Sequence, residues 1–324
     1  MSTSPALAYH AGGLGDFVLS LPALQRLAAS RPGVTWHYWG PRERLALLPG
    51  WSPPPAELLR GEGSLWGEHP ATDAASWLAG ADPVVAFAAA PPPWLPTGPR
   101  GLHLQAFSGS PGAAVEWVPR FQASQLDSAS VPRMAQPWLP RWRRQVLPLH
   151  PGGRLVLHPG SGDRAKNLPL ATWHRAAETL GQELGLSPLV LEGPVEQERG
   201  VPEEGWPAER CGCSSLDDLL AVLSRASLLL GNDSGVAHLA GLLGIPTVVA
   251  FGPSDPARWH PLGPRVEVVR SPRPCAPCCG APPILCDHHS CLGEITAAAV
   301  IATARRLLAV APGPGGQGIR SGRR

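Results

Sequence analysis

The chain has 324 residues, of which 44% are hydrophobic and 16% charged, and its formal net charge is +2. This composition is typical of a globular chain that can bury a large core, and the length favours two domains of ordinary size. The near-neutral charge and the absence of a basic stretch interleaved with aromatic residues argue against a nucleic-acid partner.

The N-terminal part of the sequence predicts a βαβ unit with a glycine-rich turn. Residues 6–10 form a short strand and residues 34–39 a second one. Between them lies a helix that Pro32-Gly33 ends, and its apolar stripe consists of Phe17, Leu21, Leu24 and Leu27. The turn before this helix carries two of the three glycines of a dinucleotide fingerprint, so a nicotinamide or flavin site is not expected there.

The same turn contains Gly12, Gly13, Gly15 and Asp16, and the aspartate allows two interpretations. It could cap the start of the helix, where the helix dipole favours a carboxylate by about 0.5–1 kcal/mol. It could equally act as a general base, because it lies at the carboxyl end of a strand. The glycines allow the helix to approach the sheet closely.

The middle of the chain is less regular. Residues 83–90 and 101–107 have the character of strands, whereas periodicity lapses over residues 138–151, which predicts a linker. We therefore expect an N-terminal domain over residues 1–148, a C-terminal domain over residues 149–311 and a disordered basic tail over residues 312–324.

The second half of the sequence predicts strands that alternate with helices. Strands are expected over residues 155–158, 189–193, 228–230 and 247–251, and helices over residues 170–184, 216–223 and 236–243. A further helix is expected over residues 293–310. Such alternation favours an α/β fold with a doubly wound parallel sheet.

Polar residues follow several of these strands, and parallel strands bring their carboxyl ends to one edge of a sheet. We therefore expect one rim to gather Ser161, Lys166, Glu196, Asp233, Ser234 and His238. A hydroxyl and an ammonium suit phosphate, and carboxylates suit ribose hydroxyls. The set therefore predicts a nucleotide-diphosphate site at the start of the helix near Ser234.

These residues also have structural interpretations. Asp233 and Ser234 could simply cap the helix that follows them, and Lys166 could be a solvated surface lysine. His238 comes four residues after Ser234 and shares its helix face, which favours a role in the same site.

A cluster of cysteines lies close to the C-terminus. Its candidate zinc ligands are Cys275, Cys278, Cys286 and Cys291, with His288 and His289 nearby. The stretch between the pairs is shorter than in common zinc ribbons, so a disulfide and reduced core cysteines remain alternatives, and we expect no metal.

The chain lacks the features of a secreted or membrane-spanning protein. Its first residues have neither the charged start nor the long apolar core of a signal peptide, and no apolar run reaches the length of a membrane span. The expectation is a cytoplasmic protein with mostly reduced cysteines. Arg305, Arg306 and the basic tail allow peripheral contact with anionic lipid, and a solvated tail is the alternative.

As a set, these motifs resemble glycosyltransferase family 9, the ADP-heptose:lipopolysaccharide heptosyltransferases. The matching pieces, in chain order, are Gly15-Asp16-x-x-Leu19-x-x-Pro22-Ala23-Leu24, His158-Pro159-Gly160-Ser161 with Lys166, Asp233-Ser234-Gly235-x-x-His238-Leu239-Ala240, and Phe251-Gly252-Pro253. The Cys275-x-x-Cys278 to Cys291 cluster also looks like that of the second heptosyltransferase type. No motif matches between about residue 40 and residue 150.

The resemblance implies a GT-B architecture, in which two Rossmann-like domains face each other across a cleft. Asp16 then matches the catalytic base in the acceptor domain. The donor-contacting positions of the C-terminal domain are Ser161, Lys166, Asp233, Ser234, Gly235 and His238. Glu196 is the preferred ribose ligand, with Glu198 as a competitor, and the family uses no Asp-x-Asp metal motif.

The expected reaction is an inverting, metal-independent transfer of heptose from ADP-heptose to a lipopolysaccharide-core acceptor. Such an enzyme is expected to be a monomer, without cofactor, that meets its lipid-linked acceptor at the inner face of the inner membrane. Two alternatives stay open: a transferase of the same family with another donor or acceptor, and a nucleotide-binding module without catalysis whose cysteines sense metal or redox state.

Overall fold

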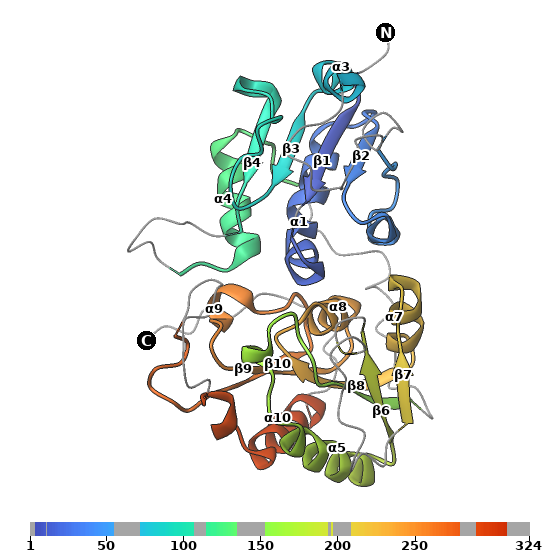
Figure 1. Ribbon diagram of the computed structural model, residues 1–324, viewed down its shortest axis with the longest axis vertical. Helices are drawn as coiled ribbons and strands as arrows, with labels where there is room; N and C mark the ends of the chain where they lie inside the picture. The colour runs from blue at the N-terminus through green and yellow to red at the C-terminus, as the bar shows by residue number, and fades with distance from the viewer. Residues whose placement is uncertain are drawn as a thin grey trace. The chain divides into compact units, whose positions relative to one another are not determined.

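The computed structural model describes residues 4–10, 12–54, 72–106, 115–134, 153–193, 196, 209–278 and 290–309. The chain divides into two compact units, and each contains an all-parallel sheet (Figure 1). One unit consists of Met1–Arg144, Cys213–Ala221 and Ala257–His260, and the other of Gln145–Gly212, Val222–Pro256 and Pro261–Arg324. Among the described residues, no helix combines the length and apolar character needed to cross a membrane.

The N-terminal sheet has the strand order β2-β1-β3-β4. Its strands are β1 (Ala6–His10), β2 (Trp36–Trp39), β3 (Val84–Phe87) and β4 (Gly101–Leu104). The helices of this domain are α1 (Leu14–Ser30), α3 (Thr72–Gly80) and α4 (Val118–Ser128), with short 3-10 helices η1 (Arg42–Leu47) and η2 (Gly98–Arg100). The order reverses between β1 and β3, which makes the carboxyl end of β1 the expected place for a ligand.

Helix α1 carries the predicted apolar stripe, and Phe17, Leu21, Leu24 and Leu27 are all buried. The helix begins three residues before Phe17, at Leu14, so Pro22 lies deeper in it than the sequence suggested. The helix nevertheless continues to Ser30. Burial of the apolar stripe offsets the backbone hydrogen bond that proline cannot make.

Helix α4 was not predicted, because its buried positions include polar residues and its sequence has no clear apolar period. It is tied to α1 by Arg26, a buried arginine whose guanidinium lies 2.6 Å from Asp127 Oδ1 and 3.1 Å from the carbonyl oxygen of Ala123. Hydrogen bonds from Arg133 and Arg26 lower the pKa of Asp127 to about 2. Asp127 is 101 positions from Arg26 in the sequence. The periodicity of the sequence is a local property, so it cannot predict this contact.

The C-terminal sheet has the strand order β10-β9-β8-β5-β6-β7. Its strands are β5 (Arg154–His158), β6 (Ser187–Glu192), β7 (Glu209–Gly212), β8 (Ala226–Asn232), β9 (Thr247–Phe251) and β10 (Val266–Arg270). Counted from β5, this is the 3-2-1-4-5-6 order of a Rossmann domain, read from the far edge. The predicted doubly wound parallel sheet is therefore confirmed.

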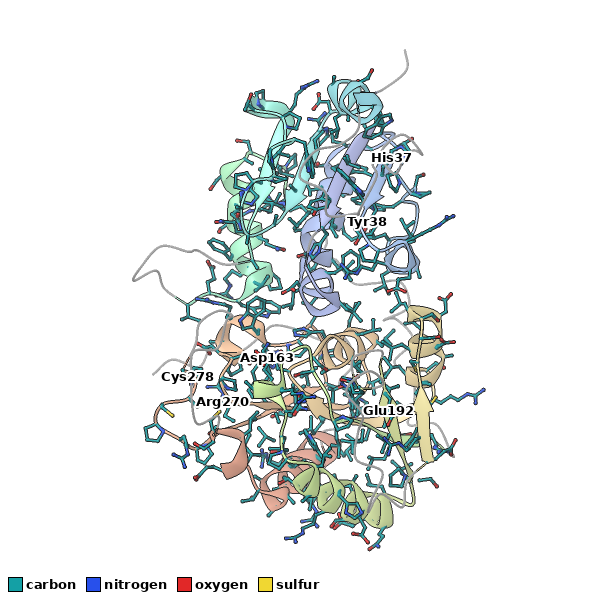
Figure 2. The ribbon with its side chains drawn as sticks, viewed as in Figure 1. His37, Tyr38, Asp163, Glu192, Arg270 and Cys278 are labelled. Carbon is teal, nitrogen blue, oxygen red and sulfur yellow. The ribbon has the colours of Figure 1, made fainter. Side chains whose placement is uncertain are left out.

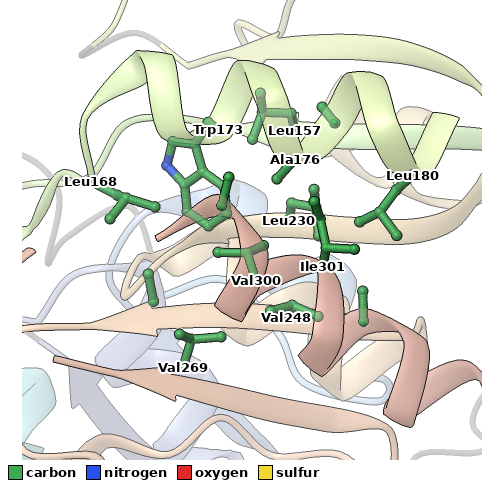
Figure 3. Close-up of a cluster of buried hydrophobic side chains, with 14 of the residues drawn as sticks. Leu157, Leu168, Trp173, Ala176, Leu180, Leu230, Val248, Val269, Val300 and Ile301 are labelled. Atoms are coloured by element: carbon green, nitrogen blue, oxygen red, sulfur yellow. The ribbon is translucent and has the colours of Figure 1, made fainter. Parts of the chain in front are cut away.

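The helices described in the second half of the chain are α5 (Leu170–Leu184), α7 (Leu216–Leu223), α8 (Gly235–Leu243), α9 (Pro256–Trp259) and α10 (Ala297–Ala309), with 3-10 helices η4 (Arg164–Lys166) and η5 (Leu292–Glu294). Most of α7 and α9 belongs to the unit that contains the N-terminal sheet. Helices α5 and α10 lie side by side on one face of the sheet, and α8 lies on the other (Figure 1). Apolar side chains of the two helices and of the strands form one buried cluster between them (Figure 3). It includes Trp173 and Leu180 of α5, Val300 and Ile301 of α10, and Leu157, Leu230 and Val248 of the strands. This apolar layer holds the sheet rigid beneath the loops at its carboxyl edge.

One strand was not predicted, one helix begins later than predicted, and two predicted segments lie outside the described residues. Strand β7 was missed, because a short edge strand with the sequence Glu-Arg-Cys-Gly has no apolar alternation. The last helix begins at Ala297 rather than Gly293, since Thr296 Oγ1 accepts the Ala299 N–H at 3.2 Å and so caps it. The predicted linker over 138–151 and the tail over 312–324 lie outside the described residues.

Replacing Trp173 with alanine should lower the free energy of unfolding by about 3–5 kcal/mol, because its indole is fully buried between α5, α10 and the sheet. Leu184→Ala, on the same helix but 40% exposed, should change it by no more than about 0.5 kcal/mol. Urea unfolding of both variants measures the difference. Similar losses in the two variants would contradict this account of the core.

Candidate functional site

The order in which the chain adds strands to the C-terminal sheet reverses between β5 and β8. These two strands pair in parallel, with His158 opposite Gly231. The chain leaves β5 toward α5 on one face and leaves β8 toward α8 on the other (Figure 1). The loops after these two strands therefore diverge, and this is where an open α/β sheet binds ligands.

The side chain of Asn232 holds the backbone beneath this site through two hydrogen bonds. It is fully buried, its Nδ2 donates to the Pro159 carbonyl at 2.7 Å, and its Oδ1 accepts the Leu168 N–H at 3.0 Å. One side chain at the end of β8 thus fixes both the loop that follows β5 and the entry to α5.

Asp233 is the centre of the charged cluster and is only 6% exposed. Its Oδ2 accepts from Lys166 Nζ at 2.8 Å and from Ser254 Oγ at 2.7 Å, and its Oδ1 lies 3.5 Å from His238 Nε2. Burial by itself would raise the pKa of Asp233, but the His238 hydrogen bond and the Lys166 charge outweigh it and hold that pKa well below its usual value. Asp233 is therefore an ionised carboxylate between two basic groups, and Lys166 is not a free surface lysine.

Ser234 caps α8, as the structural interpretation of this residue predicted. Its Oγ accepts the Ala237 N–H at 3.4 Å, and Gly235 is the first helical residue. The remaining N–H groups of the first turn carry the positive end of the helix dipole. The start of α8 is therefore suited to an anion.

Glu196 lies at the same edge and is buried. Its Oε2 accepts the Gly193 N–H at 2.9 Å and lies 3.4 Å from His158 Nε2. Burial would raise the pKa of Glu196, but the hydrogen bonds from His158 and from the Gly193 N–H lower it below its usual value. Its competitor Glu198 lies outside the described residues.

Ser161 is also brought to this edge, in the loop after β5. Its Oγ lies 2.6 Å from both the Asp163 carbonyl and Asn167 Oδ1, so the hydroxyl is already engaged within its own loop. Asp163, labelled in Figure 2, caps the 3-10 turn that carries Lys166 by accepting the Ala165 N–H at 2.9 Å. All six predicted rim residues therefore come together at the carboxyl edge of β5, β6 and β8.

In the N-terminal domain, Asp16 lies in the first turn of α1, and its Oδ2 accepts the Gly13 N–H at 2.9 Å. The carboxylate therefore caps the helix, and among the described residues no hydrogen bond to its second oxygen is found. Gly12 must lack a side chain, because an added Cβ would lie 2.7 Å from Asp16 Cβ. Gly13 is the residue that precedes the helix, and Gly15 is its second residue.

Two residues that the sequence did not single out hold this glycine-rich turn. Arg44, buried in η1, donates to the Gly12 carbonyl at 2.9 Å, and its guanidinium lies 5.2 Å from the centre of the Phe17 ring. His10 Nδ1 accepts the Gly12 N–H at 3.2 Å. Burial and the charge of Arg44 lower the pKa of His10 to about 3, so its imidazole is a neutral acceptor.

The structure describes only part of the cysteine cluster. Cys275 and Cys278 are exposed on the segment that follows β10 (Figure 2), whereas Cys291 is buried in the core. Over the part of the chain that the structure describes, no group of three His, Cys, Asp or Glu side chains could hold a metal ion. Cys286, His288 and His289 lie outside it, so the zinc alternative is not tested.

A Rossmann-ordered sheet with a helix start, a lysine and buried carboxylates at its switch point defines a nucleotide-binding enzyme of the α/β class. The model of glycosyltransferase family 9 (heptosyltransferase) matches residues 125–286, which is half of the chain. The chain belongs to glycosyltransferase family 9, and it is a glycosyltransferase.

One sequence relative and several solved structures cover most of its length. Lipopolysaccharide heptosyltransferase 1 of Pseudomonas aeruginosa is 28% identical over an alignment of length 301 that covers 82% of this chain and 83% of that protein. The fold matches the glycosyl transferase family 9 structure from Veillonella parvula with a TM-score of 0.65, at 17% identity over 95% of this chain and 98% of that one. It matches the Escherichia coli heptosyltransferase WaaC, solved with ADP, with a TM-score of 0.60, at 18% identity over 94% and 99%.

These structural matches confirm the predicted GT-B fold class, with two parallel-sheet α/β domains. The fold also resembles TibC of enterotoxigenic E. coli, an iron-containing dodecameric glycosyltransferase, with a TM-score of 0.57 at 16% identity over 95% of this chain and 77% of that one. At this identity the likeness concerns the fold, and the iron of TibC is not transferred to the cysteines of this chain.

Asp233→Asn should make the protein less stable at neutral pH, by about 3 kcal/mol, because Lys166 loses the buried carboxylate that balances it. The folded-state pKa of Asp233 is depressed, so its ionised form stabilises the folded protein above the unfolded-state pKa of about 4. That stabilisation is lost as pH falls toward the folded-state pKa.

The difference in unfolding free energy between wild type and Asp233→Asn should therefore shrink as pH falls below about 4. Urea unfolding at pH 7, 5 and 3 measures it, with Asp217→Asn on the exposed side of α7 as the control. A difference that stays constant or grows toward acid pH would show that Asp233 is not a stabilising ionised group.

Proposed function

We propose that this protein is an inverting, metal-independent glycosyltransferase that moves heptose from ADP-heptose to a lipopolysaccharide-core acceptor. The name of its Pseudomonas relative and the ADP bound by WaaC support the donor and acceptor classes. The observation that carries the proposal is the cluster of Lys166, Asp233 and His238 beside the start of α8.

In this proposal the C-terminal domain, over residues 149–311, binds the nucleotide sugar. The N–H groups at the start of α8 and the ammonium of Lys166 bind the diphosphate. His238 contributes as well: its Nε2 faces Asp233, and its buried Nδ1 has no hydrogen-bond partner among the described residues. As an imidazolium it would donate to Asp233 through one nitrogen and to the leaving phosphate through the other. Glu196 accepts from the ribose hydroxyls.

The N-terminal domain, over residues 1–148, binds the acceptor and supplies Asp16 as the general base. The acceptor oxygen attacks the anomeric carbon while its proton passes to the Asp16 carboxylate, and the bond from that carbon to the diphosphate breaks. ADP leaves with the bonding electrons, and one displacement inverts the anomeric configuration. The N–H groups at the start of α8, Lys166 and His238 stabilise the charge on the leaving diphosphate without a metal ion.

The lipid-linked acceptor also sets where such an enzyme works. We place it in the cytoplasm, as a monomer in peripheral contact with the inner membrane. No organic cofactor enters the reaction, because the nucleotide sugar itself carries the activated bond.

Purified protein titrated with ADP, UDP and GDP in a calorimeter should bind ADP most tightly. Lys166→Ala should weaken ADP binding by roughly 10–100-fold, since one charge-assisted hydrogen bond to the diphosphate is lost. Arg164→Ala, which removes an exposed positive charge from the same 3-10 turn, should leave ADP binding within about twofold. Equal effects of the two variants would remove Lys166 from the donor site.

Asp16→Asn should lower kcat for heptose transfer by at least about 100-fold, because the amide cannot take the acceptor proton. ADP affinity should be unchanged, since Asp16 belongs to the other domain. Turnover with ADP-heptose and a core acceptor measures the first quantity and calorimetry the second, with Asp82→Asn as the control. Full turnover in Asp16→Asn would refute its role as the base.

A further inference from the structure

His158 is a buried imidazole for which the mechanism above has no task. It is 4% exposed, at the last position of β5, next to the reversal of the sheet. Its Nδ1 lies 3.2 Å from Ser234 Oγ, and its Nε2 lies 3.4 Å from Glu196 Oε2. The ring thus connects the cap of α8 to the carboxylate beyond β6.

The hydrogen bonds around His158 account for every proton when the ring is neutral and protonated on Nε2. Ser234 Oγ accepts the Ala237 N–H and donates its own proton to Nδ1. Nε2–H then donates to Glu196 Oε2, which also accepts the Gly193 N–H. The three side chains form one directed chain of donors that ends on the carboxylate.

The two oxygens of Glu196 face different groups. Oε2 takes both hydrogen bonds just described, whereas Oε1 lies against the backbone of Gly160. A Cβ added to Gly160 would lie 1.8 Å from that oxygen. The glycine therefore keeps room for the carboxylate beside the loop that follows β5, and an oxygen of this kind accepts hydrogen bonds from hydroxyl groups.

We propose that His158 is a positioning residue of the donor site, which orients Glu196 to accept hydrogen bonds from the ribose hydroxyls of the nucleotide. The inference rests on the proposed function, because it assumes a nucleotide in this site. Ser234 and the ribose-binding carboxylate of Glu196 are then linked by hydrogen bonds through His158. Binding of the ribose therefore depends on a histidine that does not contact the ligand.

The chain offers a matched pair of variants for the test. The amide of glutamine can replace Nε2 and reach Glu196, whereas the shorter amide of asparagine can replace only Nδ1 and reach Ser234. Calorimetric titration with ADP and with 2′-deoxy-ADP gives the ratio of the two dissociation constants, which reports the ribose contact alone. Loss of overall stability affects both nucleotides and does not by itself move this ratio.

The wild-type protein should prefer ADP over 2′-deoxy-ADP by about 10-fold or more, the value of a hydrogen bond to a charged group. His158→Gln should keep most of that preference, and His158→Asn and Glu196→Gln should lose it. A preference that survives in His158→Asn, or equal binding of the two nucleotides by the wild type, would overturn the role of His158. No ADP binding by the wild type would instead refute the proposed function.

If either histidine variant fails to fold, as judged by circular dichroism, the same inference is tested in proteins that keep His158. Nitrogen-15 spectra of the histidine rings should show His158 protonated on Nε2 in the wild type and a changed ring signal in Glu196→Gln. Ring signals that are the same in both proteins would overturn the proposed link between His158 and Glu196.

Discussion

The pairing of β5 with β8 is the constraint on which the donor side of this protein depends. His158 and Ser234 are 76 positions apart in the sequence, yet parallel pairing brings the ends of their strands together at one edge of the sheet. Because the following helices leave toward opposite faces, the loops after the two strands diverge beside the start of α8. The apolar layer beneath α5 and α10 fixes this geometry, so the residues at the edge can be polar without loss of the fold.

Burial determines how those polar residues behave. Asp233 can remain ionised away from water only because Lys166, Ser254 and His238 surround it. The same contacts hold the lysine and the histidine in place before any ligand arrives. Preorganised charge of this kind loses little free energy on binding, which is the main advantage of a rigid site over a flexible one.

In the N-terminal domain, a glycine-rich turn holds the carboxylate of Asp16 in place. Asp16 caps α1 through one oxygen, and the turn around it is held by a neutral His10 and by a buried arginine, Arg44. A helix cap and a general base are therefore compatible uses of one carboxylate. The cap fixes the direction of the side chain, and among the described residues no hydrogen bond engages the other oxygen.

The sequence by itself determined the order of strands and helices in the C-terminal half, the glycine-rich turn before α1 and the family, because apolar periodicity and short motifs are local properties. It also predicted which six residues gather at the carboxyl edge of the C-terminal sheet, since parallel strands all end on the same side. It did not predict α4, β7, or the contacts of Asn232, Ser254 and Arg44. Those depend on partners far away in the chain: Asn232 reaches the loop after β5, and Arg44 reaches Gly12. Whether Asp233 was a cap or a buried ion, and what His158 connects, was decided only by the tertiary structure, because hydrogen bonding and burial are properties of the packed chain.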